Sequence, residues 1–454
     1  MKIKNFLFII LSGIVLSCSV LPVNVWAADS DDGLGLPDFP QIVSDYVVLM
    51  DADSGEVLYS SNKDEKCYPA STTKLLTALL VMENCALSDT VTYSQAAVNS
   101  IEFGDANASI VAGEELSVEQ SLYCLLLRSA NEVAYGLAEY VGKTESAFAS
   151  MMNDKATELG AVNTHFTNAS GLTDAFHYTT PYDMALIAKA CFNNKSLMRI
   201  VSYSELYTIG PTNKSNFTRY YRHRYQMLAG GEYAYKYSCG GKTGYTDAAG
   251  SCLVSFAQKD DLRLICVIMK SSEEDRYLDT INLFDYYFNN FKKVPLADFD
   301  TGLDSGSIDI LELTNRFDSS TGISIGFSED AYILIPKSVD ALKLTGIVTY
   351  ADNAAYTGEE GGFACISYYY ENTRLGSATI FINRSSTEGV IPGTNGVSKL
   401  GADSIYQEED IFFLNIWYIV GGVLVICVIT AAVIFVTKSK ARRHGRYGSR
   451  KLHF

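Results

Sequence analysis

Histidine and tryptophan are scarce in this sequence of 454 residues, with five and two copies respectively. There is no H-E-x-x-H pattern and no C-x-x-C pair, so a zinc peptidase, a zinc ribbon and a thioredoxin-like site have no support. We therefore expect no metal and no cofactor. With 48% apolar and 19% charged residues, the composition is that of a globular protein, which excludes a disordered or collagen-like chain.

Positive charge is also in short supply, since 36 Lys and Arg face 52 Asp and Glu for a net charge of −16. Nine of the 36 cations lie at the two ends of the chain, which leaves 27 against all 52 acids in between. A protein that binds nucleic acid needs a basic surface, so we expect no nucleic-acid partner.

The two ends have the pattern of targeting segments. Residues 1–27 combine early lysines, an apolar run and a small-residue cleavage site, which predicts a secretory signal peptide. Residues 411–436 contain no charged side chain and are long enough to cross a bilayer as one helix. Residues 437–454 carry seven cations and no acid, which places this tail in the cytoplasm. The alternative of buried core helices fits these ends less well.

The residues between the ends divide into three parts. Residues 28–293 begin with strands at 45–50 and 56–59, and continue with helices at 75–82, 118–127, 132–141 and 146–159. Strands at 250–258 and 262–269 and a helix at 277–291 follow, so we expect an α+β domain whose sheet takes strands from distant parts of the chain. Residues 294–384 show short alternating runs typical of a small all-β domain, with strands at 308–313, 323–327, 332–336, 342–350, 363–370 and 377–382. Residues 385–410 are polar and form a predicted linker.

Eight cysteines lie between the two terminal apolar runs, an even number that permits disulfides in an exported protein. However, Cys124, Cys252 and Cys266 fall within apolar runs, and we expect these three to pack as small hydrophobic residues.

The first of three short motifs is Ser71-Thr72-Thr73-Lys74, placed just before an apolar helix. Ser71 and Lys74 are three residues apart, and residues with this spacing lie on the same face of a helix. The Lys74 amine can therefore lie beside the Ser71 hydroxyl. A serine hydroxyl is a weak nucleophile until a neighbouring group takes its proton, and a lysine does so only if its pKa is lowered. Taken alone, the motif is better explained as a helix cap followed by a solvated lysine.

Two further short motifs follow Ser71–Lys74 along the chain. Ser129-Ala130-Asn131 lies at a break between two predicted helices, where both polar side chains can point into one cleft. On its own, this motif is better explained as a turn or a helix cap. Lys242-Thr243-Gly244 precedes Tyr245 and opens a predicted strand, whose edge can bind a peptide. The order S-x-x-K, S-x-N, K-T-G is the signature of serine enzymes that recognise penicillin.

The chain resembles the low-molecular-mass penicillin-binding proteins, which are serine-type D-Ala-D-Ala carboxypeptidases. The similarity covers Tyr68–Lys74, Gly241–Thr246 and stretches between the second and third motifs: Thr164–Phe166, Asn168, Gly171–Leu172, His177–Thr180 and Asp183–Ala185. It implies a penicillin-binding/serine β-lactamase-like transpeptidase fold, an antiparallel sheet with a helical subdomain, followed by the all-β domain. The charge-free run at 411–436, which is not part of the resemblance, adds one predicted C-terminal transmembrane helix. The resemblance further implies a bacterial enzyme held in the cell membrane, with peptidoglycan stem peptides as substrates and β-lactam antibiotics as inhibitors.

The resemblance also implies a role for each motif residue. Ser71 attacks the terminal D-Ala-D-Ala bond, Lys74 takes its proton and Ser129 passes a proton to the leaving D-alanine. Asn131 holds the acyl-side amide, and Lys242 and Thr243 bind the free carboxylate. Gly244 leaves room for the substrate backbone, and the N–H groups of Ser71 and Tyr245 form the oxyanion hole.

Two departures from the family pattern are Ala130 and Glu132, where glycine and aspartate are common. The chain also has a predicted transmembrane span at residues 411–436, whereas such proteins usually end in an amphipathic helix. Two other functions remain open: a β-lactamase, although no E-x-x-x-N segment lies between Asn131 and Lys242, and a non-catalytic wall-binding module. His165 and His177 are less favoured as bases, because the family uses lysine.

Overall fold

The computed structural model describes residues 34–296, 323–326, 331–351, 362 and 364–384. The predicted signal peptide, strand 308–313, linker, transmembrane helix 411–436 and basic tail lie outside these residues. Among the helices that are described, none is both long enough and apolar enough to cross a membrane.

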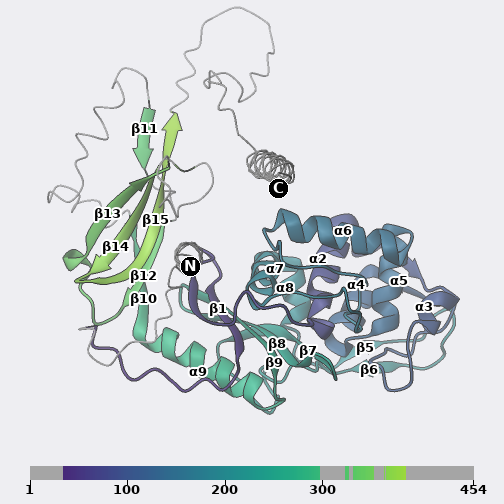
Figure 1. Cartoon of the computed structure of the whole chain (residues 1–454). Helices are drawn as coiled ribbons and strands as arrows, with labels where there is room; N and C mark the ends of the chain where they lie inside the picture. Colours follow the sequence, from purple (N-terminus) through teal and green to yellow (C-terminus); the bar gives the residue numbers. More distant parts are fainter. Residues whose placement is uncertain (1–33, 297–322, 327–330, 352–361, 363, 385–454) are drawn as a thin grey trace, which may run out of the picture. The chain divides into compact units, whose positions relative to one another are not determined.

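A five-stranded antiparallel sheet forms the centre of the N-terminal part, in the order β2-β1-β9-β8-β7 (Figure 1). Its strands are β1 (Tyr46–Asp51), β2 (Val57–Ser61), β7 (Ser238–Thr246), β8 (Gly250–Lys259) and β9 (Leu262–Ser271). Val48 of β1 pairs with Val267 of β9, so the first strand lies beside one more than 200 residues later. This confirms the prediction of one sheet from distant segments, and it leaves β7 at an edge.

Two hydrophobic cores lie on opposite faces of this sheet, because neighbouring side chains of a strand point to opposite sides. Val47 and Leu49 pack with helix α9 (Asp275–Asn290), whereas Val48 and Met50 pack with the larger helical part. That part contains α2 (Lys74–Asn84), α3 (Gln95–Asn99), α4 (Val118–Tyr123), α5 (Asn131–Gly142), α6 (Glu145–Glu158), α7 (Pro181–Asn193) and α8 (Lys195–Val201). The short strand pairs β3 (Thr90–Thr92) with β4 (Glu115–Ser117), and β5 (Tyr207–Ile209) with β6 (Arg219–Tyr221), complete it.

The predicted helix at 118–127 is found in place but changes its winding. It is α-helical to Tyr123 and then becomes a π-helix over Cys124–Arg128. A π-turn inserts an extra residue into a helix and occurs often at functional sites. Ser129, which follows, has a φ of +63°, in the left-handed region that non-glycine residues rarely adopt.

The β-rich part contains β10 (Phe291–Pro295), β11 (Ile323–Gly326), β12 (Tyr332–Pro336), β13 (Thr345–Tyr350), β14 (Ala364–Tyr370) and β15 (Thr373–Arg384). Strands β11, β15, β14 and β13 form one sheet, and β10 pairs with β12. Alternate residues such as Ile333, Ile335 and Ile366 form its core. Five of the six predicted strands thus have counterparts here, while the sixth lies outside the described residues.

Cys124, Cys252 and Cys266 are fully buried and do not form disulfides. Burial raises the pKa of their thiols to about 12, 11 and 12 respectively. The prediction that these three pack as small hydrophobic residues is confirmed.

Candidate active site

Ser71 lies in a single turn of 3-10 helix, Ala70–Thr73, immediately before α2. Ala70 has a φ of +47°, a strained value for a residue with a Cβ. Gly171 packs directly on this turn, since a Cβ on Gly171 would lie 1.8 Å from the Ala70 carbonyl oxygen. The half-buried Ser71 is therefore presented by a turn whose shape depends on a neighbouring loop.

Lys74 is completely buried, and its amine joins the first two motifs. Nζ donates to Ser71 Oγ at 2.9 Å and to Asn131 Oδ1 at 2.7 Å, and also to the Ser170 carbonyl oxygen. Burial lowers the pKa of Lys74 to about 7, although the carboxylates of Glu132 and Asp105 act in the opposite direction. Near neutral pH a substantial fraction of this amine is unprotonated and able to accept a proton.

Ser129 and Asn131 lie on either side of the break between the π-helix and α5. The left-handed conformation of Ser129 ends the π-helix, and Asn131 is the first residue of α5. Both side chains are buried. The break lets Asn131 reach Lys74 while Ser129 Oγ accepts a hydrogen bond from Lys242 Nζ at 3.0 Å.

The third motif lies on edge strand β7. Lys242 is buried and also donates to the Thr243 carbonyl oxygen at 2.6 Å, while Thr243 is half-buried and Tyr245 is exposed. Burial lowers the pKa of Lys242 well below its usual value, and the nearby Lys74 adds to the effect. A Cβ on Gly244 would lie 3.1 Å from the Ser71 backbone nitrogen, so this strand passes directly beside the turn that carries Ser71.

Arg276 of α9 was not identified from the sequence, although it holds the same strand from the other side. Its buried guanidinium donates from one nitrogen to the carbonyl oxygens of Gly244 and Cys252, both at 3.3 Å. The Ser170 carbonyl was missed for a similar reason, because a backbone acceptor has no side-chain signature. The turn signal Asn168-Ala169-Ser170-Gly171 marks its position, since Asn168 Oδ1 accepts from Gly171 N at 2.7 Å.

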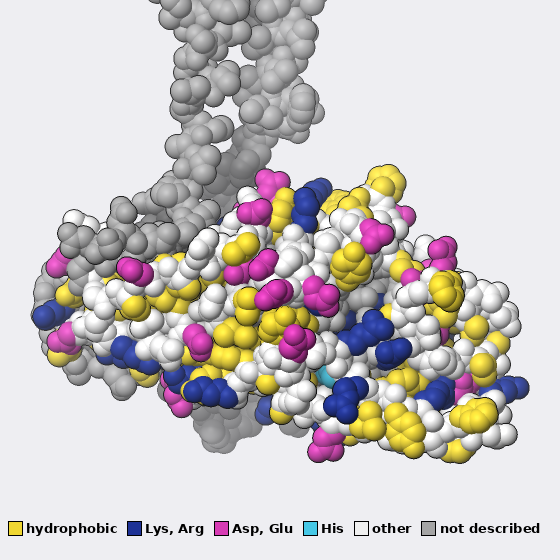
Figure 2. Space-filling model, turned by 90° about the horizontal axis from the view of Figure 1, so that it is seen from below, with side chains coloured by type: hydrophobic (Ala, Val, Ile, Leu, Met, Phe, Trp, Pro, Cys, Tyr) yellow, Lys and Arg dark blue, Asp and Glu magenta, His cyan; other side chains and the backbone are white. Residues whose placement is uncertain are grey.

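Arg224 is a second basic residue that sequence reasoning missed. It is exposed, and its charge lowers the pKa of both Lys74 and Lys242, which places it near both amines. The pKa of Arg224 is itself lowered, mainly by burial and to a smaller extent by the charge of Arg128. Several Lys and Arg side chains gather on the right of the face in Figure 2, whereas Asp and Glu are scattered. The site is therefore locally basic within an acidic protein.

The two histidines near the motifs have supporting contacts. Neutral His177 accepts from Thr167 N at Nδ1 (3.1 Å) and lies 2.9 Å from Thr73 Oγ1 at Nε2. Burial lowers its pKa to about 4. His165 lies 2.7 Å from the Phe176 carbonyl oxygen through Nδ1. Neither has a hydrogen bond to Ser71, as expected if lysine is the base.

A G-x-S-x-G sequence, which marks the nucleophile elbow of another hydrolase class, occurs at residues 322–326. The structure places Ser324 within strand β11. An elbow serine occupies a turn between a strand and a helix, so this pattern does not form one.

Comparison with known proteins identifies the family to which these motifs belong. A model described as D-alanyl-D-alanine carboxypeptidase, Peptidase_S11, matches residues 36–273, which include all three motifs. The chain belongs to the D-alanyl-D-alanine carboxypeptidase family. The predicted class of enzyme, a serine-type carboxypeptidase, is thereby confirmed.

Individual family members are distant in sequence. D-alanyl-D-alanine carboxypeptidase DacF of Bacillus subtilis is 33% identical over 255 residues, a match that spans 55% of this chain and 63% of that protein. DacA of Escherichia coli is 27% identical over 341 residues, which span 72% of this chain and 80% of that protein. The match therefore covers less than two thirds of the Bacillus protein.

Solved structures of the family support the predicted fold. The DD-transpeptidase of Streptomyces K15 aligns with a TM-score of 0.52 and 28% identity, covering 56% of this chain and all of that one. A D-alanyl-D-alanine carboxypeptidase of Mycobacterium tuberculosis aligns with a TM-score of 0.51 and 28% identity, covering 56% of this chain and 94% of that one. DacD of Francisella tularensis, at 21% identity and a TM-score of 0.58, covers 78% of this chain and 98% of that one, and so supports the fold alone. The penicillin-binding transpeptidase-like fold is confirmed.

Proposed function

We propose that this protein is a D,D-carboxypeptidase that removes the terminal D-alanine of peptidoglycan pentapeptides through an acyl-enzyme on Ser71. The observation that carries the proposal is the continuous set of contacts among the three motifs. Lys74 contacts Ser71 and Asn131, while Lys242 contacts Ser129. All six distinctive polar residues of the family signature therefore fall within one site.

Acylation uses the lowered pKa of Lys74. The neutral amine takes the Ser71 proton as Oγ bonds to the carbonyl carbon of the penultimate residue, and the N–H groups of Ser71 and Tyr245 stabilise the resulting oxyanion. The C–N bond then breaks, and Ser129 relays a proton to the leaving nitrogen. Water attacks the acyl-enzyme and regenerates Ser71. Asn131 holds the acyl-side amide during both steps.

Capture of the substrate depends on its terminal carboxylate. Lys242 and Arg224 provide positive charge, and Thr243 adds a hydroxyl group on the same strand edge. Because Lys242 is buried among cations, a bound carboxylate supplies the counter-charge that favours its ammonium form. A β-lactam, which carries a similar carboxylate beside a strained amide, would acylate Ser71 in the same position.

The experiment measures D-alanine release from a pentapeptide ending in D-Ala-D-Ala, together with covalent labelling by a fluorescent penicillin. We expect both in the wild type, neither in Ser71→Ala, and both in Ser196→Ala, which alters an exposed serine on α8. Labelling without D-alanine release would contradict the peptidase. Rapid, sustained cephalosporin hydrolysis would favour a β-lactamase, and failure of both assays would favour a non-catalytic wall-binding module.

We also propose that residues 411–436 anchor the protein in the cell membrane with residues 437–454 inside and the catalytic part outside. The support is the charge-free length of the segment and the seven cations that follow it. The full chain should sediment with membranes, and a chain ending at residue 410 should be released into the medium. Release of the full chain would contradict the anchor.

A further inference from the structure

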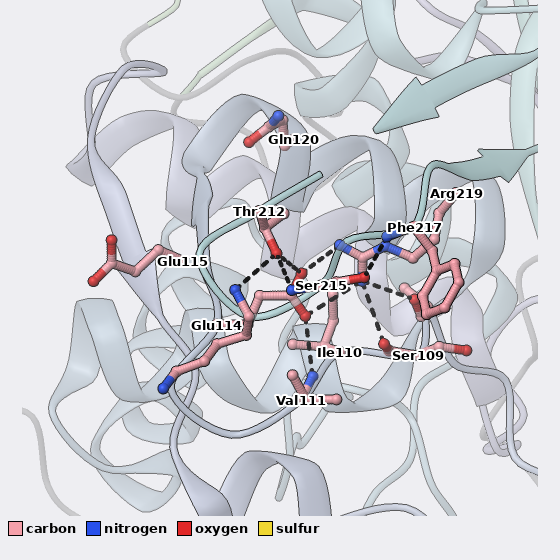
Figure 3. Close-up of polar contacts among 12 residues, drawn as sticks. Ser109, Ile110, Val111, Glu114, Glu115, Gln120, Thr212, Ser215, Phe217 and Arg219 are labelled. Carbon is pink, nitrogen blue, oxygen red and sulfur yellow. Dashed lines mark hydrogen bonds and ion pairs between the residues drawn. The ribbon is translucent and has the colours of Figure 1, made fainter. Parts of the chain in front are cut away.

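A buried carboxylate ties together two segments that flank the second motif. Glu114, which is fully buried, forms an ion pair with Arg219 and accepts hydrogen bonds from Thr212 Oγ1 at 2.8 Å and Val111 N at 3.1 Å (Figure 3). Asn213 strengthens the junction, because its side chain accepts from Glu115 N and donates to the Gly113 carbonyl oxygen, both at 2.9 Å. The segment 109–115 is thereby joined to the segment 212–219.

Arg219 extends this junction to the backbone that leads to the second motif. One of its nitrogens donates to the carbonyl oxygens of Ala108 (3.5 Å) and Ser109 (3.3 Å), and Tyr221 Oη donates to Ala108 O at 2.7 Å. Ser109 has a φ of +56°. A left-handed conformation at a serine persists only where the surroundings hold it, and Arg219 is one of the groups that do so.

Backbone N–H groups of the same segment bind Glu132. Its Oε1 accepts from Ala108 N at 2.6 Å and from Ile110 N at 3.4 Å, while Oε2 is buried without a hydrogen-bond partner among the described residues. Asn131, the neighbouring residue, donates its backbone N–H to Ala106 O at 2.8 Å. The side chain of Arg128 donates to Asn107 O at 3.1 Å. Residues 106–110 therefore hold both ends of the second motif.

We propose that Glu114 and Arg219 are positioning residues for the reaction, which act by holding residues 106–110 against Glu132 and so fix Ser129 and Asn131. Among the residues that the structure describes, neither side chain has a hydrogen bond or an ion pair with Ser71 or Lys74. The inference rests on the proposed carboxypeptidase function, because it concerns the placement of residues that serve that reaction.

The test compares Glu114→Gln and Arg219→Gln with the wild type in the full chain. We expect kcat for D-alanine release to fall about tenfold in each variant. In the variants, residues 106–110 are held less firmly, so the N–H groups that hydrogen-bond to Glu132 would move away and its charged form would lose stabilisation. A less charged Glu132 raises the pKa of Lys74 less than it does in the wild type. The midpoint of the pH profile for acylation by penicillin should therefore move to lower pH. The double variant should be no worse than the poorer single variant, because the two residues act as one unit.

Asp53→Asn provides the matched control, since Asp53 forms ion pairs with Arg263 and Lys293 away from the motifs. We expect it to change thermal stability without moving kcat or the pH midpoint. Should Arg219→Gln fail to fold, Arg219→Lys keeps the charge and should show a smaller change in the same direction. The proposal is overturned if folded Glu114 and Arg219 variants match the wild type in kcat and pH midpoint, or if Asp53→Asn changes both quantities by the same amount. An inactive wild type would instead overturn the proposed function and this inference with it.

Discussion

Lys74 loses its hydration when the protein folds, and in the proposed mechanism this loss determines whether Ser71 can react. An exposed lysine has a pKa of about 10.4 and would be almost fully protonated at neutral pH. Burial lowers the pKa of Lys74 to about 7, while Glu132 prevents a further fall. Proton acceptance is therefore available at physiological pH without a histidine, so the proposed activation of Ser71 is compatible with a chain poor in histidine.

The first prediction concerns the pH dependence of acylation. A protonated Lys74 cannot accept the Ser71 proton, so the second-order rate constant for penicillin acylation should rise as pH increases through about 7 and then level off. Lys74→Arg keeps a protonated group at all these pH values, and we expect it to lower the rate by about 10²–10⁴-fold. Stopped-flow or quenched labelling between pH 5 and 9 measures both. A flat wild-type profile would contradict the assignment of Lys74 as base.

The second prediction concerns His177 and stability. The pKa of His177 is about 4 in the folded protein and about 6.5 in an unfolded chain. Between these values the unfolded state binds a proton that the folded state does not. The free energy of unfolding should thus fall as pH decreases from 6.5 to 4, with about 3 kcal/mol from this residue.

Urea unfolding at pH 7.5, 5.5 and 4.5 tests this linkage. His177→Gln should be less stable at pH 7.5 but should show a weaker pH dependence. His223→Gln is a matched variant, because burial lowers the pKa of His223 to about 3 and its loss should weaken the dependence in the same direction. An unchanged slope in His177→Gln would show that this histidine does not contribute to the linkage.

At the scale of elements, the sequence was informative wherever apolar residues recur with a clear period. The predicted helices 132–141 and 146–159 correspond to α5 and α6, and the predicted strands 250–258 and 262–269 to β8 and β9, with shifts of one or two residues. Helix α7 was missed although its start has a clear signal, since Thr180 caps the helix by accepting from Asp183 N and Pro181 follows it. The predictable elements are those that bury a regular face.

For the site, the sequence identified the side chains of the three motifs but not the groups that support them. Its side chains come from motifs with fixed order, so the residues that meet around Lys74 and Lys242 were identified in advance. The supports were not, because they are backbone carbonyls such as that of Ser170 or charges such as Arg276 that are distant in sequence. The π-helix could not be read from Cys124–Arg128 either, since its apolar residues suit an α-helix equally well. Tertiary packing decides these features.

The third prediction compares two glycines with nearly equal backbone angles. Gly171 and Gly230 have φ of +82° and +83°, but only Gly171 has a neighbour that a Cβ would contact, the carbonyl of Ala70. Gly230→Ala should cost about 1 kcal/mol of stability through backbone strain alone. Gly171→Ala should cost more and should also slow acylation at least tenfold, because the turn that carries Ser71 must move.

Chemical unfolding and penicillin labelling of both variants separate these effects. Equal stability and equal labelling rates in the two alanine variants would contradict a role for Gly171 in shaping the turn that carries Ser71.

At the scale of the whole molecule, charge is distributed unevenly. The stretch between the basic ends carries 27 cations against 52 acids, yet Lys74, Lys242 and Arg224 lie close together at the site. A bound anion would therefore be attracted locally despite the net negative charge around it. The overall charge, from which we expect no nucleic-acid partner, gives no indication of the charge of the substrate.

The fourth prediction uses the position of the two tryptophans, Trp26 and Trp417, which lie in the predicted signal peptide and the predicted anchor. A secreted chain ending at residue 410 should therefore show fluorescence from its tyrosines alone after signal cleavage. Emission spectra excited at 295 nm test this. A strong tryptophan band would show that Trp26 is retained and that the predicted cleavage site is wrong, and mass spectrometry would give the true N-terminus.

The π-helix at Cys124–Arg128 has a consequence for how this enzyme can vary over evolution. Each residue of an α-helix turns the chain by about 100°, so a deletion of one residue here would restore regular winding and rotate Ser129 away from Lys242. Such a deletion would keep the hydrophobic face nearly intact, and the chain could still fold. We therefore expect natural variants and laboratory libraries to tolerate apolar substitutions within 124–127 but to exclude changes in its length.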